Sequence, residues 1–375
     1  MKKTLSLLFL IILSSLNSIQ AQRLREFGIE PGVMKTGSLN SITDVPGVKV
    51  GHTTLLAAGE MATGVTVIMP HDGNIFQEKV PAAVYVGNGF GKLMGTTQVE
   101  ELGYLESPVV LTNTLNVPKV ADAVLDYLLN LPGNENVRSA NPVVGETNDG
   151  YLNNIRARYV EAEHLFKAIE KASGENVEEG CIGAGTGTVC FGFKGGIGTS
   201  SRIMSGGLEG YTVGVLVQTN FGGDLKIDGY PVGEFYRKKG KDNIPEPPQD
   251  GSCMIVVATD APLDSRNLER LAKRAMLGLA RTGGIASNGS GDYVIAFSTA
   301  PELREHYGSR DLKTGAPVIS NDNMSQLFQG VIEATEEAIL NSLFMATEVE
   351  GYQGHKVPVL PKNEIAKLII NRKNP

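Results

Sequence analysis

Runs of apolar residues predict many short β-strands separated by a few amphipathic helices. The strand-like runs are rich in β-branched residues and are bounded by glycine, proline or asparagine. They cover residues 48–55, 64–69, 82–86, 108–112, 188–193, 196–204, 211–217, 252–260 and 293–299. Apolar residues recur with helical spacing over residues 118–130, 152–173, 265–281, 323–345 and 363–371. This order lacks regular βαβ repeats and favours a sandwich of sheets covered by helices.

Two of the predicted helices have specific signals for their inner face or their ends. In residues 152–173, Leu165, Phe166 and Ile169 are expected to face inward, and Gly174 is expected to end the helix. By contrast, Pro118 is well suited to the first turn of its helix, because proline there lacks only an N–H that would be unpaired anyway.

Length and composition indicate one large folded domain. The chain has 375 residues, of which 41% are hydrophobic and 20% are charged, as is typical of a globular protein. No linker separates two independent cores, so residues 22–375 are predicted to form a single domain. A formal charge of −7 argues against the basic surface that a nucleic-acid-binding protein needs.

The first 21 residues have the pattern of a secretory signal peptide. Two lysines precede an apolar run over residues 5–13, and small or polar residues lead to Ala21. The run is too short for a transmembrane helix. We therefore expect cleavage before Gln22 and a periplasmic or secreted mature protein. A retained membrane anchor is the alternative.

The sequence offers no pattern for a metal or a nucleotide cofactor. None of the five histidines is paired at metal-ligand spacing. The glycine-rich segment 87–92 lacks the Ser or Thr of a phosphate-binding loop, and segment 183–188 lacks the spacing of a dinucleotide fingerprint. Segment 87–92 is instead predicted to line the substrate site or to pack. Cys181, Cys190 and Cys253 form no disulfide framework, and free thiols are favoured over a Cys181–Cys190 bond.

One serine lies where a polar segment gives way to an apolar strand. Residues 237–250 are rich in Lys, Gly and Pro, and Gly251 precedes Ser252 at the start of the strand. The Ser252 hydroxyl could attack the carbonyl of Gly251, and hydrolysis would leave Ser252 as a new N-terminus. Its α-amine, with an ordinary pKa of about 7.7–8.0, could then activate the hydroxyl. A simple turn is the alternative. Strand alternation sends the Cys253 side chain to the opposite face.

Several short motifs occur together and in a characteristic order. They are TDVPGVKVGHTT (43–54), VVGETNDG (143–150), GAGTGT (183–188), KGGIGTSS (194–201), GS (251–252), ATDAPL (258–263) and NGSGD (288–292). The ordered set resembles the L-aminopeptidase/D-esterase and β-aminopeptidase family, whose members cleave themselves before a serine and then hydrolyse N-terminal residues from amides, peptides or esters. The resemblance implies an αββα sandwich related to N-terminal-nucleophile hydrolases. It also implies cleavage into residues 22–251 and 252–375, and a homo-oligomer of the processed heterodimers.

The same resemblance implies roles for four further residues. Asn220, after a predicted strand, matches the family's oxyanion-binding asparagine, although its local sequence suggests a strand cap. Ser290 and Asp292, from a glycine-flanked loop, match the serine and the acid that orient the nucleophile; some members have glutamate in place of Asp292. Glu146, in a short polar loop, matches the glutamate that binds the substrate's amine.

Two other functions are compatible with the sequence. One is an acyltransferase similar to ornithine acetyltransferase, although those enzymes use threonine where this chain has Ser252. The other is a secreted binding protein that keeps the fold without catalysis. For the hydrolase, the expected partner is a small peptide, amide or ester with a free amine. The sequence does not discriminate among α-L-peptides, β-peptides, D-amino-acid amides and esters.

Overall fold

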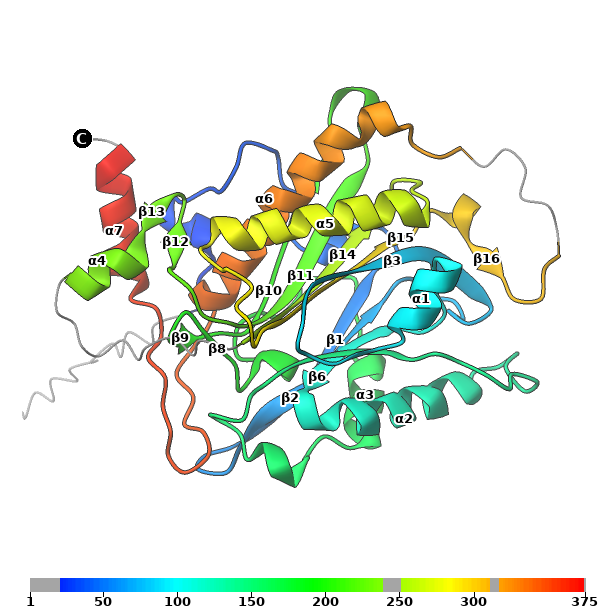
Figure 1. The fold of residues 1–375 in the computed structure, drawn as a ribbon, viewed down its shortest axis with the longest axis horizontal. Coiled ribbons are helices and arrows are strands. Elements are labelled where there is room, and N and C mark those ends of the chain that lie inside the picture. Colours follow the sequence, from blue (N-terminus) through cyan, green and yellow to red (C-terminus); the bar gives the residue numbers. More distant parts are fainter. Residues whose placement is uncertain (1–20, 239–250, 311–316, 374–375) are drawn as a thin grey trace, which may run out of the picture.

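The computed structural model describes residues 21–238, 251–310 and 317–373. Two β-sheets face each other, and helices cover the outer face of each sheet, so the layers follow the order αββα (Figure 1). The fold class predicted from the sequence is confirmed. In the part of the chain described here, no helix is long and apolar enough to cross a membrane.

The smaller sheet has five strands in the order β1–β2–β6–β7–β4. They are β1 (Lys49–Ala57), β2 (Met61–Met69), β6 (Val109–Asn113), β7 (Val143–Thr147) and β4 (Leu93–Met94). Only β6 and β7 run parallel. Helices α2 (Val117–Leu129) and α3 (Ala162–Glu170) pack on the outer face of this sheet.

The larger sheet has seven strands, six of them in the order β10–β11–β14–β15–β3–β16, with β5 also paired to β3. They are β10 (Ile197–Ile203), β11 (Thr212–Asn220), β14 (Ser252–Thr259), β15 (Gly291–Ser298), β3 (Glu78–Gly89), β16 (Glu305–His306) and β5 (Tyr104–Leu105). Strands β14 and β15 are parallel, whereas β11 and β14 are antiparallel. Helices α5 (Ser265–Arg281) and α6 (Met324–Phe344) cover the outer face.

Shorter elements surround the two sheets. Helix α1 (Thr96–Leu102) contacts β3, and α4 (Val232–Lys238) follows the hairpin of β12 (Lys226–Ile227) and β13 (Tyr230–Pro231). A second hairpin joins β8 (Val189–Cys190) to β9 (Phe193–Lys194), and α7 (Lys362–Lys373) is near the C-terminus. The sequence predicted α7 over residues 363–371, whereas α1, α4 and the hairpin of β12 and β13 are too short to produce a hydrophobic period and were not predicted.

Strand β14 separates two hydrophobic cores by the alternation of its side chains. Met254 and Val256 face the core between the sheets, whereas Cys253 and Ile255 face the core beneath α5 and α6. The predicted position of Cys253 is therefore confirmed. All three cysteines are free, as favoured from the sequence.

The helix predicted over residues 152–173 was wrong in length and partly wrong in its inner face. Residues 149–153 form a turn instead, because the backbone carbonyl of Asp149 accepts hydrogen bonds from the N–H groups of Leu152 and Asn153, and a short 3-10 helix follows at Ile155–Ala157. The helix ends before Gly174. Leu165 is buried as expected, but Phe166 is 40% exposed.

The single strand predicted over residues 188–193 was also wrong. Phe191 and Gly192 both have left-handed backbone conformations, with φ of 54° and 79°, and this turn divides the segment into β8 and β9. Phe191 is apolar because its ring packs against Phe221, with the ring centroids 5.0 Å apart, and not because it belongs to a strand.

Candidate active site

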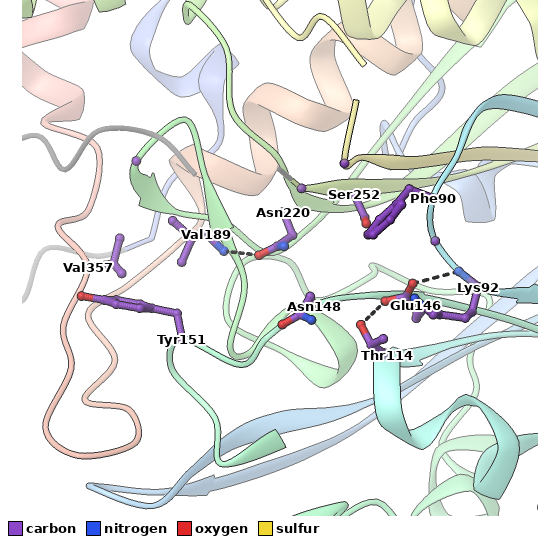
Figure 2. A pocket seen from close by; sticks show the side chains of 14 residues that line it. Phe90, Lys92, Thr114, Glu146, Asn148, Tyr151, Val189, Asn220, Ser252 and Val357 are labelled. Carbon is purple, nitrogen blue, oxygen red and sulfur yellow. Dashed lines mark hydrogen bonds between the residues drawn. The ribbon is translucent and has the colours of Figure 1, made fainter. Parts of the chain in front are cut away.

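A cavity of about 450 Å³ lies at the ends of β7, β11 and β14. Three predicted site residues, Glu146, Asn220 and Ser252, line it together (Figure 2). They come from three strands belonging to both sheets. Segment 87–92 contributes Phe90, Gly91 and Lys92 to the wall, as expected of a lining segment, but its first half is the end of β3 instead of a loop.

Ser252 is the first residue of β14, as predicted, and its side chain is 7% exposed. Its hydroxyl oxygen accepts a hydrogen bond from the Gly291 N–H at 3.3 Å. The preceding residue must be small, because a Cβ added to Gly251 would lie 2.3 Å from the backbone oxygen of Asn220. Residues 239–250, most of the polar segment expected before this site, lie outside the described residues.

Asn220 is the last residue of β11 and lies opposite Ser252 in the antiparallel ladder. Its side-chain Oδ1 accepts a hydrogen bond from the Val189 N–H at 2.9 Å, as Figure 2 shows. This bond fixes the orientation of the amide, because a backbone N–H can pair only with the oxygen end. The Nδ2 group is therefore the end that can donate a hydrogen bond to a ligand.

Glu146 lies within β7, so the loop predicted for it was wrong; only residues after Thr147 leave the strand. The side chain is 2% exposed. Its Oε1 accepts from the Lys92 N–H at 2.9 Å, and its Oε2 accepts from the Thr114 hydroxyl. Burial raises the pKa of Glu146, and these two donors together with the charge of Lys92 oppose that rise. The result is an oriented carboxylate in the cavity wall.

Ser290 and Asp292 are buried at the start of β15, and Asp292 belongs to the strand itself instead of the expected loop. Parallel pairing places Gly291 beside Ser252, and Asp292 beside Cys253. Alternation therefore directs Asp292 to the sheet face opposite the Ser252 hydroxyl. Burial raises the pKa of Asp292 to about 6, opposed by the nearby Ser290 hydroxyl and Cys253 backbone N–H. These two side chains thus lie beside the main chain that follows Ser252.

The far end of the cavity contains residues that the sequence did not reveal. Tyr151 and Val357 line it, and the Tyr151 ring stacks on His355 with centroids 4.6 Å apart. Thr114 and Asn148 also line the cavity. Asn148 belongs to the motif at residues 143–150, whereas Thr114, Tyr151 and Val357 have no local signal for a site. All five histidines are described, and none lines the cavity directly.

Known proteins resemble this chain in sequence and in fold. Residues 40–357 match peptidase family S58. The chain is 39% identical over 382 residues to β-peptidyl aminopeptidase BapA of Sphingosinicella microcystinivorans, covering 96% of this chain and 94% of that protein.

Two solved structures have the same fold over almost their whole length. The β-aminopeptidase of a Burkholderia species has a TM-score of 0.86 at 40% identity, covering 93% of this chain and 99% of that one. The L-aminopeptidase D-Ala-esterase/amidase of Ochrobactrum anthropi, described as a variant of the N-terminal-nucleophile hydrolase fold, has a TM-score of 0.86 at 33% identity, covering 94% and 99%.

These findings confirm the resemblance drawn from the ordered motifs. They decide against the acyltransferase and the non-catalytic binding protein, because the matched family is one of peptidases and the matched relatives are aminopeptidases. The chain belongs to peptidase family S58 and is an aminopeptidase of the N-terminal-nucleophile type.

Proposed function

We propose that this chain is an exported, self-processing serine aminopeptidase that removes N-terminal residues from small peptides, amides or esters with a free amine. The observation that carries the proposal is the shared cavity of Ser252, Asn220 and Glu146. These side chains supply a nucleophile, a donor for the oxyanion and a carboxylate for the substrate's amine, which are the groups that such a reaction needs.

Self-cleavage is supported by the backbone around Gly251. The Gly291 N–H donates to the carbonyl oxygen of Gly251 at 2.9 Å and also reaches the Ser252 hydroxyl. In the proposed step the Ser252 oxygen attacks the Gly251 carbonyl carbon, and negative charge develops on the oxygen that Gly291 contacts. The C–N bond breaks, and the proton lost by the Ser252 hydroxyl passes to the Ser252 nitrogen, which becomes a free amine. Water then hydrolyses the ester, which leaves a carboxylate on Gly251.

Hydrolysis of a substrate uses the new N-terminus. The α-amine of Ser252 accepts the hydroxyl proton while the oxygen attacks the substrate carbonyl, and the proton then passes to the leaving group. Water then hydrolyses the ester on Ser252, which releases the acid and restores the hydroxyl. The Nδ2 of Asn220 donates to the oxyanion, a contribution of about 3–4 kcal/mol at the transition state. Ser290 and Asp292 lie beside the main chain of residues 252–253, where they are suited to hold the α-amine.

The two ends of the cavity suggest the direction in which a substrate binds. Glu146 lies at one end, and Tyr151 and Val357 lie at the other (Figure 2). The substrate's ammonium group would pair with Glu146, and the leaving group would extend towards the apolar end. The matched relatives include β-peptidyl aminopeptidases, so we propose that N-terminal β-amino-acid residues are accepted. A panel of free-amine α-L-, β- and D-aminoacyl p-nitroanilides would test this.

The proposed mature enzyme consists of residues 22–251 and 252–375 after export by residues 1–21. Strand β11 of the first chain pairs directly with β14 of the second, so the two chains would stay in one αββα domain. We further propose that these heterodimers assemble into a homo-oligomer in the periplasm or outside the cell. N-terminal sequencing should find chains that begin at Gln22 and Ser252.

The decisive experiment compares Ser252→Ala with wild type. Wild type should give two bands and hydrolyse free-amine substrates, whereas the variant should remain one inactive band because it has no hydroxyl to attack Gly251. Cys253→Ala is the matched control, since that side chain is also buried but faces α5 and α6. It should be processed and active. Efficient cleavage of Ser252→Ala would contradict the assignment of the nucleophile.

A further inference from the structure

Lys194 is a fully buried lysine for which the proposed mechanism has no role. Its side chain is 0% exposed, and no carboxylate lies within ion-pair distance among the residues described. The ammonium group instead donates to three backbone carbonyls, those of Gly185 at 3.1 Å, Thr188 at 3.0 Å and Gly195 at 2.8 Å. Burial lowers the pKa of Lys194, opposed by the nearby Cys181, Cys190 and Asp149 side chains. A buried cation is costly unless its hydrogen bonds are made, and here all three of its donors are used.

One of those carbonyls belongs to the peptide group that holds Asn220. The Thr188–Val189 peptide accepts from Lys194 through its C=O and donates to Asn220 through its N–H, at 2.9 Å. Because a peptide group is planar, fixing its C=O also fixes the direction of its N–H. The neighbouring Phe191 N–H donates to the Phe221 carbonyl at 2.7 Å, so the same hairpin also holds the residue after Asn220.

We propose that Lys194 is a positioning residue for the oxyanion site. It acts through two amide groups in series: the Thr188–Val189 peptide and then the side chain of Asn220. Hydrogen bonds in such a chain polarise one another, so the ammonium strengthens the Val189 bond, and the polarised amide of Asn220 becomes a better donor to the oxyanion. This inference rests on the proposed function, because it requires Asn220 to bind the oxyanion.

A double-mutant cycle of Lys194→Met and Asn220→Ala tests the inference. Asn220→Ala alone should lower kcat about 10²- to 10³-fold. Lys194→Met alone should lower kcat roughly tenfold with little change in KM, because the lost polarisation and alignment act at the transition state. In the Asn220→Ala background, Lys194→Met should have no further effect on kcat. The rates are measured per processed heterodimer.

Two further variants separate positioning from general stability. Lys362→Met is the matched control: Lys362 is also buried and donates to a backbone carbonyl, that of Ala346 at 3.1 Å, outside the hairpin. It should lower the melting temperature and leave kcat unchanged. Lys194→Arg keeps the charge and should recover part of the loss in kcat, and it serves in the cycle if Lys194→Met does not fold. Folding of Lys194→Met is favoured because Thr188 still accepts from the Gly195 N–H, and Gly185 from the Thr188 hydroxyl.

The outcomes distinguish the inference from the proposed function. An equal loss of kcat from Lys194→Met in both backgrounds would show that Lys194 acts independently of Asn220, and would overturn the inference alone. A rise in KM at constant kcat would overturn it as well. If Asn220→Ala keeps the wild-type kcat, the oxyanion assignment fails, and the role of Lys194 fails with it.

Discussion

At the scale of single residues, Glu146 is the side chain that would distinguish an exopeptidase from an endopeptidase. Each of its oxygens accepts one hydrogen bond from the protein, from the Lys92 N–H and from the Thr114 hydroxyl. Each carboxylate oxygen has a second acceptor site, so the group can still pair with an ammonium ion. In the proposed function, this fixed carboxylate would favour a substrate with a free amine over an internal peptide bond, which has no positive charge.

We predict that Glu146→Gln lowers kcat/KM for free-amine substrates roughly 10- to 100-fold, the range expected for one charge-assisted pair of about 1.5–3 kcal/mol. Self-cleavage should continue, because it involves no substrate amine. In wild type, KM should rise as pH falls through the raised pKa of Glu146, since protonation removes the negative charge. The variant should lack this rise. Steady-state kinetics across pH check both expectations.

N-acetylated substrates should be poor for wild type, and equal turnover of acetylated and free-amine substrates would contradict the assignment.

At the scale of elements, the register of three strands assembles the site. Antiparallel pairing places Asn220 opposite Ser252, and parallel pairing places Gly291 beside Ser252 on the other side. The proposed oxyanion donor, the proposed nucleophile and the N–H that contacts the Gly251 carbonyl therefore come from β11, β14 and the start of β15. A shift of one residue in either pairing would turn the side chains to the opposite face.

The close approach of Gly251 to β11 gives a prediction for this register. In Gly251→Ala, the new Cβ would lie 2.3 Å from the Asn220 oxygen and 2.5 Å from the Phe221 Cα, so the start of β14 must shift. We expect a destabilisation of about 1–3 kcal/mol and self-cleavage slowed at least tenfold, because the scissile carbonyl moves away from the Gly291 N–H. A time course on a gel and thermal unfolding measure the two effects.

Gly207→Ala is the control for that substitution. No atom lies within 4 Å of a Cβ added at Gly207, so its processing rate and stability should match those of wild type. If Gly251→Ala also cleaves itself at the wild-type rate, self-cleavage does not depend on the observed position of the Gly251 carbonyl.

At the scale of the whole molecule, the two segments on either side of the proposed cut share both cores and a buried ion-pair cluster. Arg202 of the first segment contacts Glu333 at 3.2 Å and Glu337 at 2.8 Å in α6 of the second. Arg25, also in the first segment, pairs with Glu337. Burial alone would raise the pKa of Glu337, but the two arginines and Asn40 hold it below its ordinary value. The cluster therefore stabilises the folded state near neutral pH, and this contribution is lost as pH falls through the lowered pKa.

We predict that Arg202→Met destabilises the protein by about 3–5 kcal/mol, because it leaves buried carboxylates without their partner. Urea unfolding should show this loss, and the two chains should separate at a lower urea concentration than in wild type. Lys273→Met removes an exposed ion pair with Glu269, at 2.6 Å, and should cost less than about 1 kcal/mol. Equal effects of the two substitutions would contradict the proposed importance of the buried cluster.

The sequence by itself determined the elements with a long, regular hydrophobic period. Helix α5 was predicted with its observed bounds, and β14 with its start at Ser252, because a long apolar stripe or run bounded by turn residues specifies an element locally. The ordered motifs also identified the family and, through it, the residues that meet in the cavity. The strand position of Glu146 was missed, because the polar residues that follow Val144 obscured a buried strand of five residues.

Only the tertiary structure decided which polar groups face one another. The strand pairing that turns Asp292 away from the Ser252 hydroxyl joins residues about forty positions apart, and no local pattern records it. The stacking of Tyr151 on His355 likewise joins residues far apart in sequence, as does the packing that surrounds Lys194, and no local pattern records either. Hydrophobic periodicity specifies which side of an element is buried, because burial is a property of that element. A hydrogen bond between distant segments depends on how the elements pack, so its partners appear only in the folded chain.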